Sequence, residues 1–144
     1  MLHTPRLYFV LEPKNHRTRE PQKGKRMTYK DLKVWQKAMD LVDAVYDLAD
    51  AFPRSELYAL SDQIRRAVVS IPSNIAEGYK RGTDNELMHF LTIANGSCAE
   101  VETQIYIAAR RKMVSEEAAQ KALSLCEDVG KMISAFYGKL KSKS

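Results

Sequence analysis

Residues 70–86 read SIPSNIAEGYKRGTDNE, and this stretch contains both the end of one helix and the start of the next. Its first half keeps the helical spacing of the apolar residues around it, although Pro72 stands inside the pattern. Its second half breaks at Gly82 and continues with Thr83 to Glu86, a capping-box pattern that begins a helix. The stretch therefore predicts two helices joined by a tight turn near residue 83.

Apolar residues recur at steps of three and four in four segments of the chain, at about 31–52, 55–82, 83–112 and 115–140. Asp31 is expected to cap the first segment, with aspartates on its solvated side. The core stripe predicted for this first helix consists of Leu32, Trp35, Met39, Val42, Tyr46 and Ala49.

Helices of this length with connections of a few residues predict an all-α fold, an antiparallel up-down-up-down four-helix bundle. No strand pattern competes with it. A proline inside a helix removes one backbone hydrogen bond and costs about 3 kcal/mol unless the helix bends. Pro72 therefore predicts a kink in the second helix.

The chain of 144 residues has a formal charge of +5, and this charge is concentrated at its start. Residues 1–27 hold seven basic and two acidic residues, so the remainder is neutral. Residues 1–28 are rich in prolines and bases, which predicts a flexible basic arm before a bundle at 29–144. In the alternative interpretation, Met27 marks the true start, and residues 1–26 come from an upstream start or are dispensable.

Cys98 and Cys126 are isolated and stand at apolar helical positions, which indicates core residues in a reducing compartment. The apolar run Leu7 to Leu11 is too short for a signal peptide or a membrane span. We therefore expect a cytoplasmic protein that does not bind membranes.

Polar residues recur at helical spacing along the second helix, and more stand at the facing positions of the third helix. This polar seam consists of Gln63, Arg66, Ser70, Asn74, Glu77, Ser97, Glu100 and Gln104. A turn near residue 83 places Ser70 opposite Ser97, Gln63 opposite Gln104, and Arg66 opposite Glu100. We expect Arg66 and Glu100 to form an ion pair and the seam to fix the register of the two helices. The alternative is an exposed hydrophilic face without a partner.

The segments LKVWQKA, FPRSELYALSDQIRRAVVSIPSNIAEGYKRG and FLTIANGSCAEVETQI occur in this order. Together they resemble the four-helix-bundle family encoded in intervening sequences of bacterial 23S ribosomal RNA genes, over about residues 29–140. The resemblance implies a ring-shaped homopentamer without established enzymatic activity. The implied bundle is also similar in architecture to accessory proteins of diversity-generating retroelements, which engage a reverse transcriptase and nucleic acid. The arm lies outside this pattern.

Motifs of catalysis or cofactor binding are missing from the sequence. Glu86 and His89 give half of a di-iron pattern, but the other histidines, His3 and His16, lie in the arm. No glycine-rich phosphate loop, Cys-His spacing or nucleophile motif is present, and Gly96-Ser97 falls within a helix. We expect no enzyme, no metal and no cofactor.

Seven basic residues fall where the first helix begins and where the second and fourth helices end. They are Lys30, Lys33, Lys80, Arg81, Lys139, Lys141 and Lys143. The topology places them at one end of the bundle, beside the arm. The opposite end combines acids with balancing bases: Asp47, Asp50, Glu56, Glu116, Glu117, Arg54, Arg110, Arg111 and Lys112.

A ring would multiply the seven cations into a basic face suited to phosphate backbones. Lysines at helix carboxyl ends also complement the helix dipole, so the same residues fit a protein without a nucleic-acid ligand. Few aromatic residues stand near them, and this disfavours sequence-specific recognition of RNA.

Helices one and three are apolar around more of their circumference than a lone bundle needs, which indicates a neighbouring subunit. The surplus residues are Leu41, Val45, Leu48, Met88, Ile93, Tyr106 and Ile107. A wide intramolecular core is the alternative. We therefore expect a homo-oligomeric, non-enzymatic bundle that binds RNA or DNA weakly and nonspecifically. The alternative is an assembly or adaptor module that binds a protein partner.

Overall fold

The computed structural model describes residues 24–143, which form four long helices and two short 3₁₀ turns. The elements are η1 (Tyr29–Asp31), α1 (Lys33–Asp50), η2 (Arg54–Glu56), α2 (Leu60–Lys80), α3 (Asp84–Arg110) and α4 (Glu116–Ser142). No strand occurs among these residues. The all-α fold expected from the sequence is confirmed, while most of the arm predicted at 1–28 lies outside the described residues.

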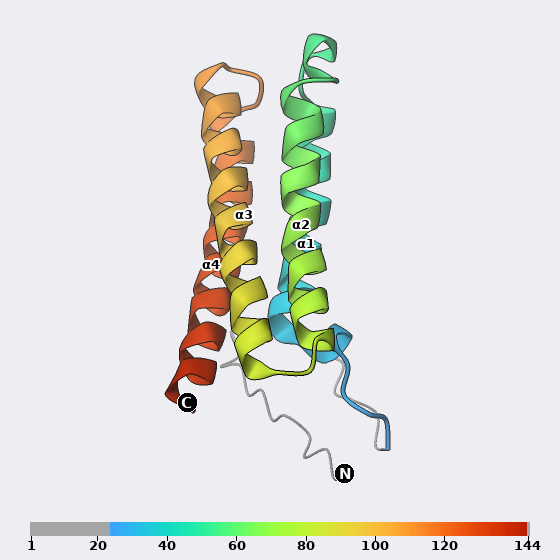
Figure 1. Cartoon of the computed structure of the whole chain (residues 1–144). Helices are drawn as coiled ribbons and strands as arrows, with labels where there is room; N and C mark the ends of the chain where they lie inside the picture. Colours follow the sequence, from blue (N-terminus) through green and yellow to red (C-terminus); the bar gives the residue numbers. More distant parts are fainter. Residues whose placement is uncertain (1–23, 144) are drawn as a thin grey trace.

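The four helices stand side by side, and the chain reverses direction at each connection (Figure 1). Between described residues, α1 contacts α2 and α4, and α3 contacts α2 and α4. The pairs α1/α3 and α2/α4 make no such contact, so they lie on the diagonals of a square bundle. This arrangement agrees with the predicted up-down-up-down topology.

Helix α3 begins at its predicted cap, since the Glu86 N–H donates to Thr83 Oγ1 at 3.3 Å. The fourth helix also begins as predicted, because Ser115 Oγ accepts the Ala118 N–H at 3.1 Å. Asp31, however, does not cap α1. Its carboxylate accepts the Thr28 N–H at 2.8 Å and closes η1, the turn before α1.

The second helix starts later than predicted. Residues from Ser55 to Ala59 form η2 and a turn, and α2 begins at Leu60. It then continues without a break to Lys80, through the buried Pro72. The kink at Pro72 stays a prediction.

The predicted core stripe of α1 is confirmed at Leu32 and Ala49, which are buried, but it is wrong at Met39 and Tyr46. Met39 and Tyr46 are each 39% exposed, whereas Leu41, Val45 and Leu48, which the sequence offered as a surplus face, are buried. The aspartates explain this orientation. Asp40, Asp43, Asp47 and Asp50 project opposite the buried side of α1, so the charged stripe rather than the largest apolar residues sets the inward face.

Helices α2 and α3 pack closely near the turn that joins them. A Cβ atom added at Gly78 would stand 2.6 Å from Phe90 Cβ and 3.2 Å from Leu87 Cδ1. Such a distance is too short for two carbon atoms in contact. Glycine is therefore required at this position for the two helices to pack as they do.

One predicted contact of the polar seam is confirmed, and another predicted contact is wrong. Ser70 Oγ donates to Ser97 Oγ at 2.6 Å, which fixes the predicted register of α2 against α3. Arg66 does not pair with Glu100. It pairs with Asp62 on its own helix at 3.1 Å, and its side chain is 80% exposed.

The remaining members of the seam differ in burial. Gln63, Glu77 and Glu100 are exposed, and Asn74 is half-buried, with its amide donating to the Ser70 carbonyl at 2.7 Å. Gln104 is buried, and its Oε1 is the one buried side-chain acceptor without a partner among the described residues. Four of the eight seam residues are therefore exposed, three are half-buried and one is buried, so neither interpretation holds for the whole seam.

Candidate nucleic-acid interface

The amino end of α1 and the carboxyl ends of α2 and α4 lie at the same end of the bundle (Figure 1). We call this region the lysine end; it comprises Lys30, Lys33, Lys80, Arg81, Lys139, Lys141 and Lys143. The Tyr79 hydroxyl donates to the Met27 carbonyl at 3.3 Å, so the chain also enters the bundle here. The structure thus brings together the seven cations that the sequence selected, while their role stays a prediction.

Three of these cations have no anionic partner within residues 24–143. Lys30, Lys80 and Lys139 are exposed and form no ion pair with any residue between 24 and 143. Lys80 and Lys139 stand in the last turns of their helices, where the partial negative charge of the carbonyl groups stabilises a cation by about 0.3–1 kcal/mol. That interaction leaves the ammonium groups in water and able to contact a phosphate.

Arg81 differs from these lysines because its charge is already engaged. Its guanidinium lies 3.0 Å from Glu77 Oε1 and 3.9 Å from Glu86 Oε1. The same group lies over the Phe90 ring, 5.3 Å from the ring centroid. Arg81 therefore ties the end of α2 to the start of α3, and we assign it a structural role at the lysine end.

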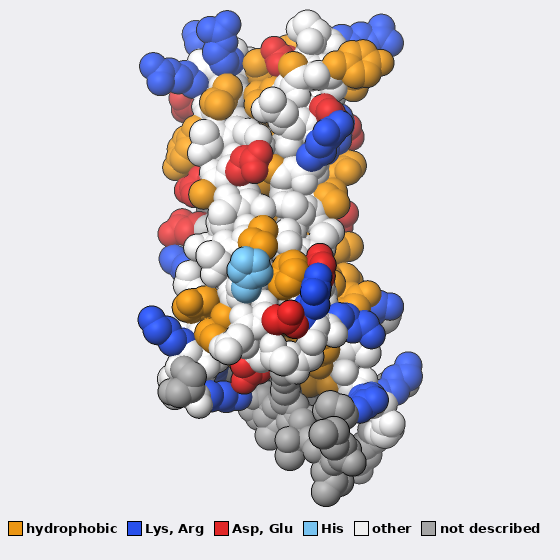
Figure 2. Space-filling view, viewed as in Figure 1, with side chains coloured by type: hydrophobic (Ala, Val, Ile, Leu, Met, Phe, Trp, Pro, Cys, Tyr) orange, Lys and Arg blue, Asp and Glu red, His pale blue; other side chains and the backbone are white. Residues whose placement is uncertain are grey.

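Basic residues gather at the opposite end as well (Figure 2). We call this region the arginine tip; it comprises Arg54, Arg110, Arg111 and Lys112, from the α1–α2 and α3–α4 connections. The sequence interpretation treated these four as a balance for nearby acids. None of the four forms an ion pair within residues 24–143. Acids and bases are therefore both present at this end, but these four bases do not contact the acids as ion pairs.

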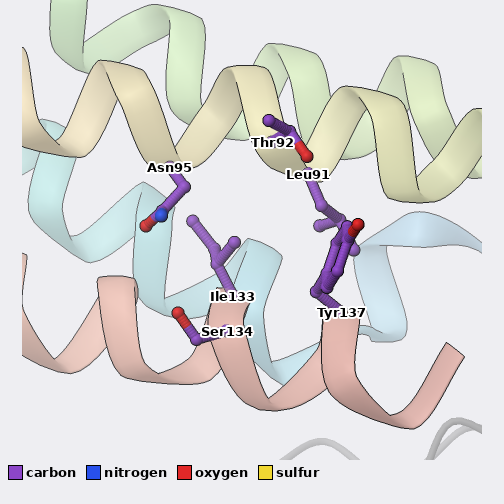
Figure 3. Close-up of a pocket in the computed structure, with 6 residues that line it drawn as sticks. All are labelled: Leu91, Thr92, Asn95, Ile133, Ser134 and Tyr137. Atoms are coloured by element: carbon purple, nitrogen blue, oxygen red, sulfur yellow. The ribbon is translucent and has the colours of Figure 1, made fainter. Parts of the chain in front are cut away.

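A groove lies between α3 and α4 that sequence reasoning did not find (Figure 3). It encloses about 210 Å³ and is lined by Leu91, Thr92, Asn95, Ile133, Ser134 and Tyr137. Sites for small ligands commonly enclose about 300–1,000 Å³ and hold convergent polar or charged groups. This groove is smaller and has no ionisable group except the Tyr137 phenol, so it is not a good candidate for a catalytic pocket.

The two cysteines lie together in the core between α3 and α4. Both are buried and free, and the Cys126 thiol donates to the Cys98 carbonyl at 3.3 Å. Hydrogen bonding with Cys126, together with burial, raises the pKa of the Cys98 thiol above its usual range. A protonated, buried thiol is a poor nucleophile, and Cys98 therefore fits the core role that the sequence predicted.

The half-pattern of a di-iron site is not completed in the described part of the chain. His89 is exposed and packs edge-on against Phe90, with 5.5 Å between the ring centroids. Within residues 24–143, no three metal-binding side chains come together. None of the described helices combines the length and apolar character needed to cross a bilayer.

A family model named 23S rRNA-intervening sequence protein matches residues 30–135, which include α1, α2, α3 and most of α4. The chain belongs to this family. The matched region contains Lys30, Lys33, Lys80 and Arg81 of the lysine end and all of the arginine tip. The last seven residues of α4, about two turns, and residues 1–29 lie outside it.

The fold is also found in a solved structure from Bacteroides thetaiotaomicron VPI-5482, described as a protein of unknown function from the S23 ribosomal protein family. The two share 19% sequence identity with a TM-score of 0.68, over 72% of this chain and 97% of that chain. At this identity the likeness shows the fold alone. No curated protein matches the chain.

Proposed function

We propose that this protein is a non-enzymatic, homo-oligomeric bundle whose lysine end binds the phosphate backbone of nucleic acid without reading its sequence. One observation carries the proposal, namely that three helix ends bring seven cations to one end of the bundle. The family resemblance implies a ring of five chains, and such a ring would repeat these cations around one face. We also propose a cytoplasmic location.

The chemistry of the lysine end favours phosphate over other partners. Lysine ammonium groups are strongly hydrated point charges on flexible stems, suited to neutralising phosphates rather than to bidentate recognition of bases. Binding of this kind releases counterions, so affinity falls steeply with salt and depends little on sequence. RNA and DNA are both expected ligands, because the contacts are to the backbone.

The decisive comparison uses two variants that each remove two positive charges. Lys80→Gln/Lys139→Gln neutralises unpaired cations of the lysine end, while Lys121→Gln/Lys131→Gln neutralises exposed cations along α4. We expect the first variant to bind a fluorescent RNA or DNA oligonucleotide about tenfold more weakly in 50 mM salt. The control variant should bind nearly as the wild type does. Equal affinity of the two variants would overturn the proposal.

A second candidate function is favoured by exposed apolar residues. Met39 and Tyr46 of α1 are partly exposed, and Arg65 of α2 lies over the Tyr46 ring, 5.6 Å from its centroid. Ile93, Tyr106 and Ile107 form another exposed apolar set on α3. These residues could bind a protein partner, as an adaptor would. Absence of nucleic-acid binding at low salt would favour this function.

A further inference from the structure

The arginine tip is a second surface with the chemistry of a phosphate-binding site. Arg110, Arg111 and Lys112 are consecutive and exposed at the end of α3. Arg54, the first residue of η2, is exposed at the same end of the bundle, where α1 leads into α2. Arginine presents planar donors that fit phosphate oxygens in pairs, which strengthens each contact.

Two of the five acids near the arginine tip are held by ion pairs, and a third accepts a backbone hydrogen bond. The Glu56 carboxylate accepts the Leu60 N–H at 3.4 Å, and Glu117 lies 3.9 Å from Lys121. Asp50 is held by Arg65 at 2.8 Å. Asp47, Glu56 and Glu116 form no ion pair within residues 24–143, and their three charges offset only part of the four cations of the tip.

The backbone at Lys112 adds a second observation. Lys112 has φ +58°, and it is the one residue other than glycine with positive φ among residues 24–143. The Met113 N–H donates to the Ala108 carbonyl at 2.9 Å, which closes the helix end in the arrangement where glycine is usual. The conformational energy of a lysine in this backbone geometry is about 1 kcal/mol higher than that of a glycine. The chain thus carries a cation at a position where its backbone favours glycine.

The two basic ends are far enough apart to act independently. Helix α3 alone has 27 residues, so the lysine end and the arginine tip are separated by about 40 Å along the bundle. This separation is several times the Debye length of about 8 Å at physiological salt. Nucleic acid bound at one end would therefore barely repel nucleic acid bound at the other.

We propose that the arginine tip binds a second phosphate backbone, so that the protein bridges two nucleic-acid duplexes held at its opposite ends. This inference rests on the proposed function of the lysine end and adds a second contact to it. Lys112→Gly removes a charge at the tip and also relieves the backbone. Loss of bridging in a variant that contains it therefore cannot be attributed to strain at this residue.

The test is a bridging assay with the full chain and two copies of one DNA duplex, one on beads and one labelled and free. The wild type should bind the duplex on the beads and capture the free, labelled duplex. The variant Arg110→Gln/Arg111→Gln/Lys112→Gly should still bind the beads but capture at least about fivefold less free duplex. The control Lys131→Gln, at an exposed position along α4 that pairs only with Glu127, should capture as much as the wild type.

Each further outcome has a separate meaning. If the wild type binds the beads but captures no free duplex, or if the tip variant captures as much as the wild type, the bridging inference is wrong while the proposed function stands. If the wild type does not bind the beads at all, the proposed function fails and bridging fails with it.

Discussion

Gly78 is the residue on which the packing of α2 against α3 depends most directly. A methyl group there would meet Phe90 Cβ at 2.6 Å, so Gly78→Ala has to push the helices apart or distort them. We expect the free energy of unfolding to fall by about 1–3 kcal/mol in urea denaturation.

Gly138 provides the matched control for this substitution. It also lies inside a long helix, but a Cβ added there would have no atom within 4 Å. Gly138→Ala should raise the free energy of unfolding by about 0.5–1 kcal/mol, because alanine is the better helix former. Stabilisation by both substitutions would contradict the close approach at Gly78.

Gln104 is a buried polar residue whose side chain is only half satisfied. Its Nε2 donates to Glu100 Oε1 at 3.4 Å, while its Oε1 has no partner within residues 24–143. An unsatisfied buried acceptor costs about 1–3 kcal/mol. Gln104→Leu should therefore raise the free energy of unfolding by about 1 kcal/mol in thermal or urea denaturation. Gln63→Leu, at an exposed position, should change it by less than about 0.5 kcal/mol, and a large loss in Gln104→Leu would refute this account.

A contact between two side chains was predictable from the sequence where the facing helix offered only one suitable partner. Ser70 and Ser97 face each other once the turn near residue 83 is known, and their hydroxyl oxygens lie 2.6 Å apart across the interface. Arg66, in contrast, has an acidic residue closer to it than Glu100. Asp62 stands one turn away on the same helix, and a pair of this kind forms without any contact between helices.

At the scale of the helices, the end of α3 offers a sharp test. Lys112 occupies a left-handed backbone position that glycine adopts without penalty. Lys112→Gly should raise the free energy of unfolding by about 1 kcal/mol, after allowance for the greater entropy of glycine in the unfolded chain. Arg111→Gly, at the preceding residue with φ −83°, should not stabilise the protein. Equal effects of the two substitutions would contradict the cap described here.

Helix starts were predictable where a side chain caps the backbone, as Thr83 and Ser115 do. The start of α2 has no such side-chain cap, so the sequence placed it too early, at Ser55. The inward face of α1 was also predictable in principle, because its aspartates mark the solvated side. The large apolar residues Met39 and Tyr46, which are exposed, obscured the pattern of the aspartates.

The whole molecule is expected to be an oligomer, because apolar side chains on α1 and α3 remain exposed in the single chain. Light scattering on the purified protein should give a multiple of the chain mass of 16.4 kDa, with five chains the expected number. Met39→Glu/Tyr46→Glu should lower this mass by placing charges in the contact. Tyr58→Glu, at a residue that is 92% exposed in the α1–α2 connection, should not. A wild type that is a monomer at all concentrations would count against the ring.

The gathering of cations at one end of the bundle followed from topology, since helices of alternating direction return to the same end. The same topology placed the four cations of the arginine tip at the opposite end, but the sequence does not show which of the acids beside them form ion pairs. Lys121 and Arg65 each engage one of those acids, and only coordinates reveal such local choices.

The salt dependence of duplex DNA binding tests the central claim most directly. If unpaired lysines at the lysine end neutralise phosphates, log K for the wild type should fall linearly with log salt, with a slope of about −3 or steeper. Lys80→Gln/Lys139→Gln should make that slope shallower by about 2. A slope near zero, or a slope that this variant leaves unchanged, would contradict the account.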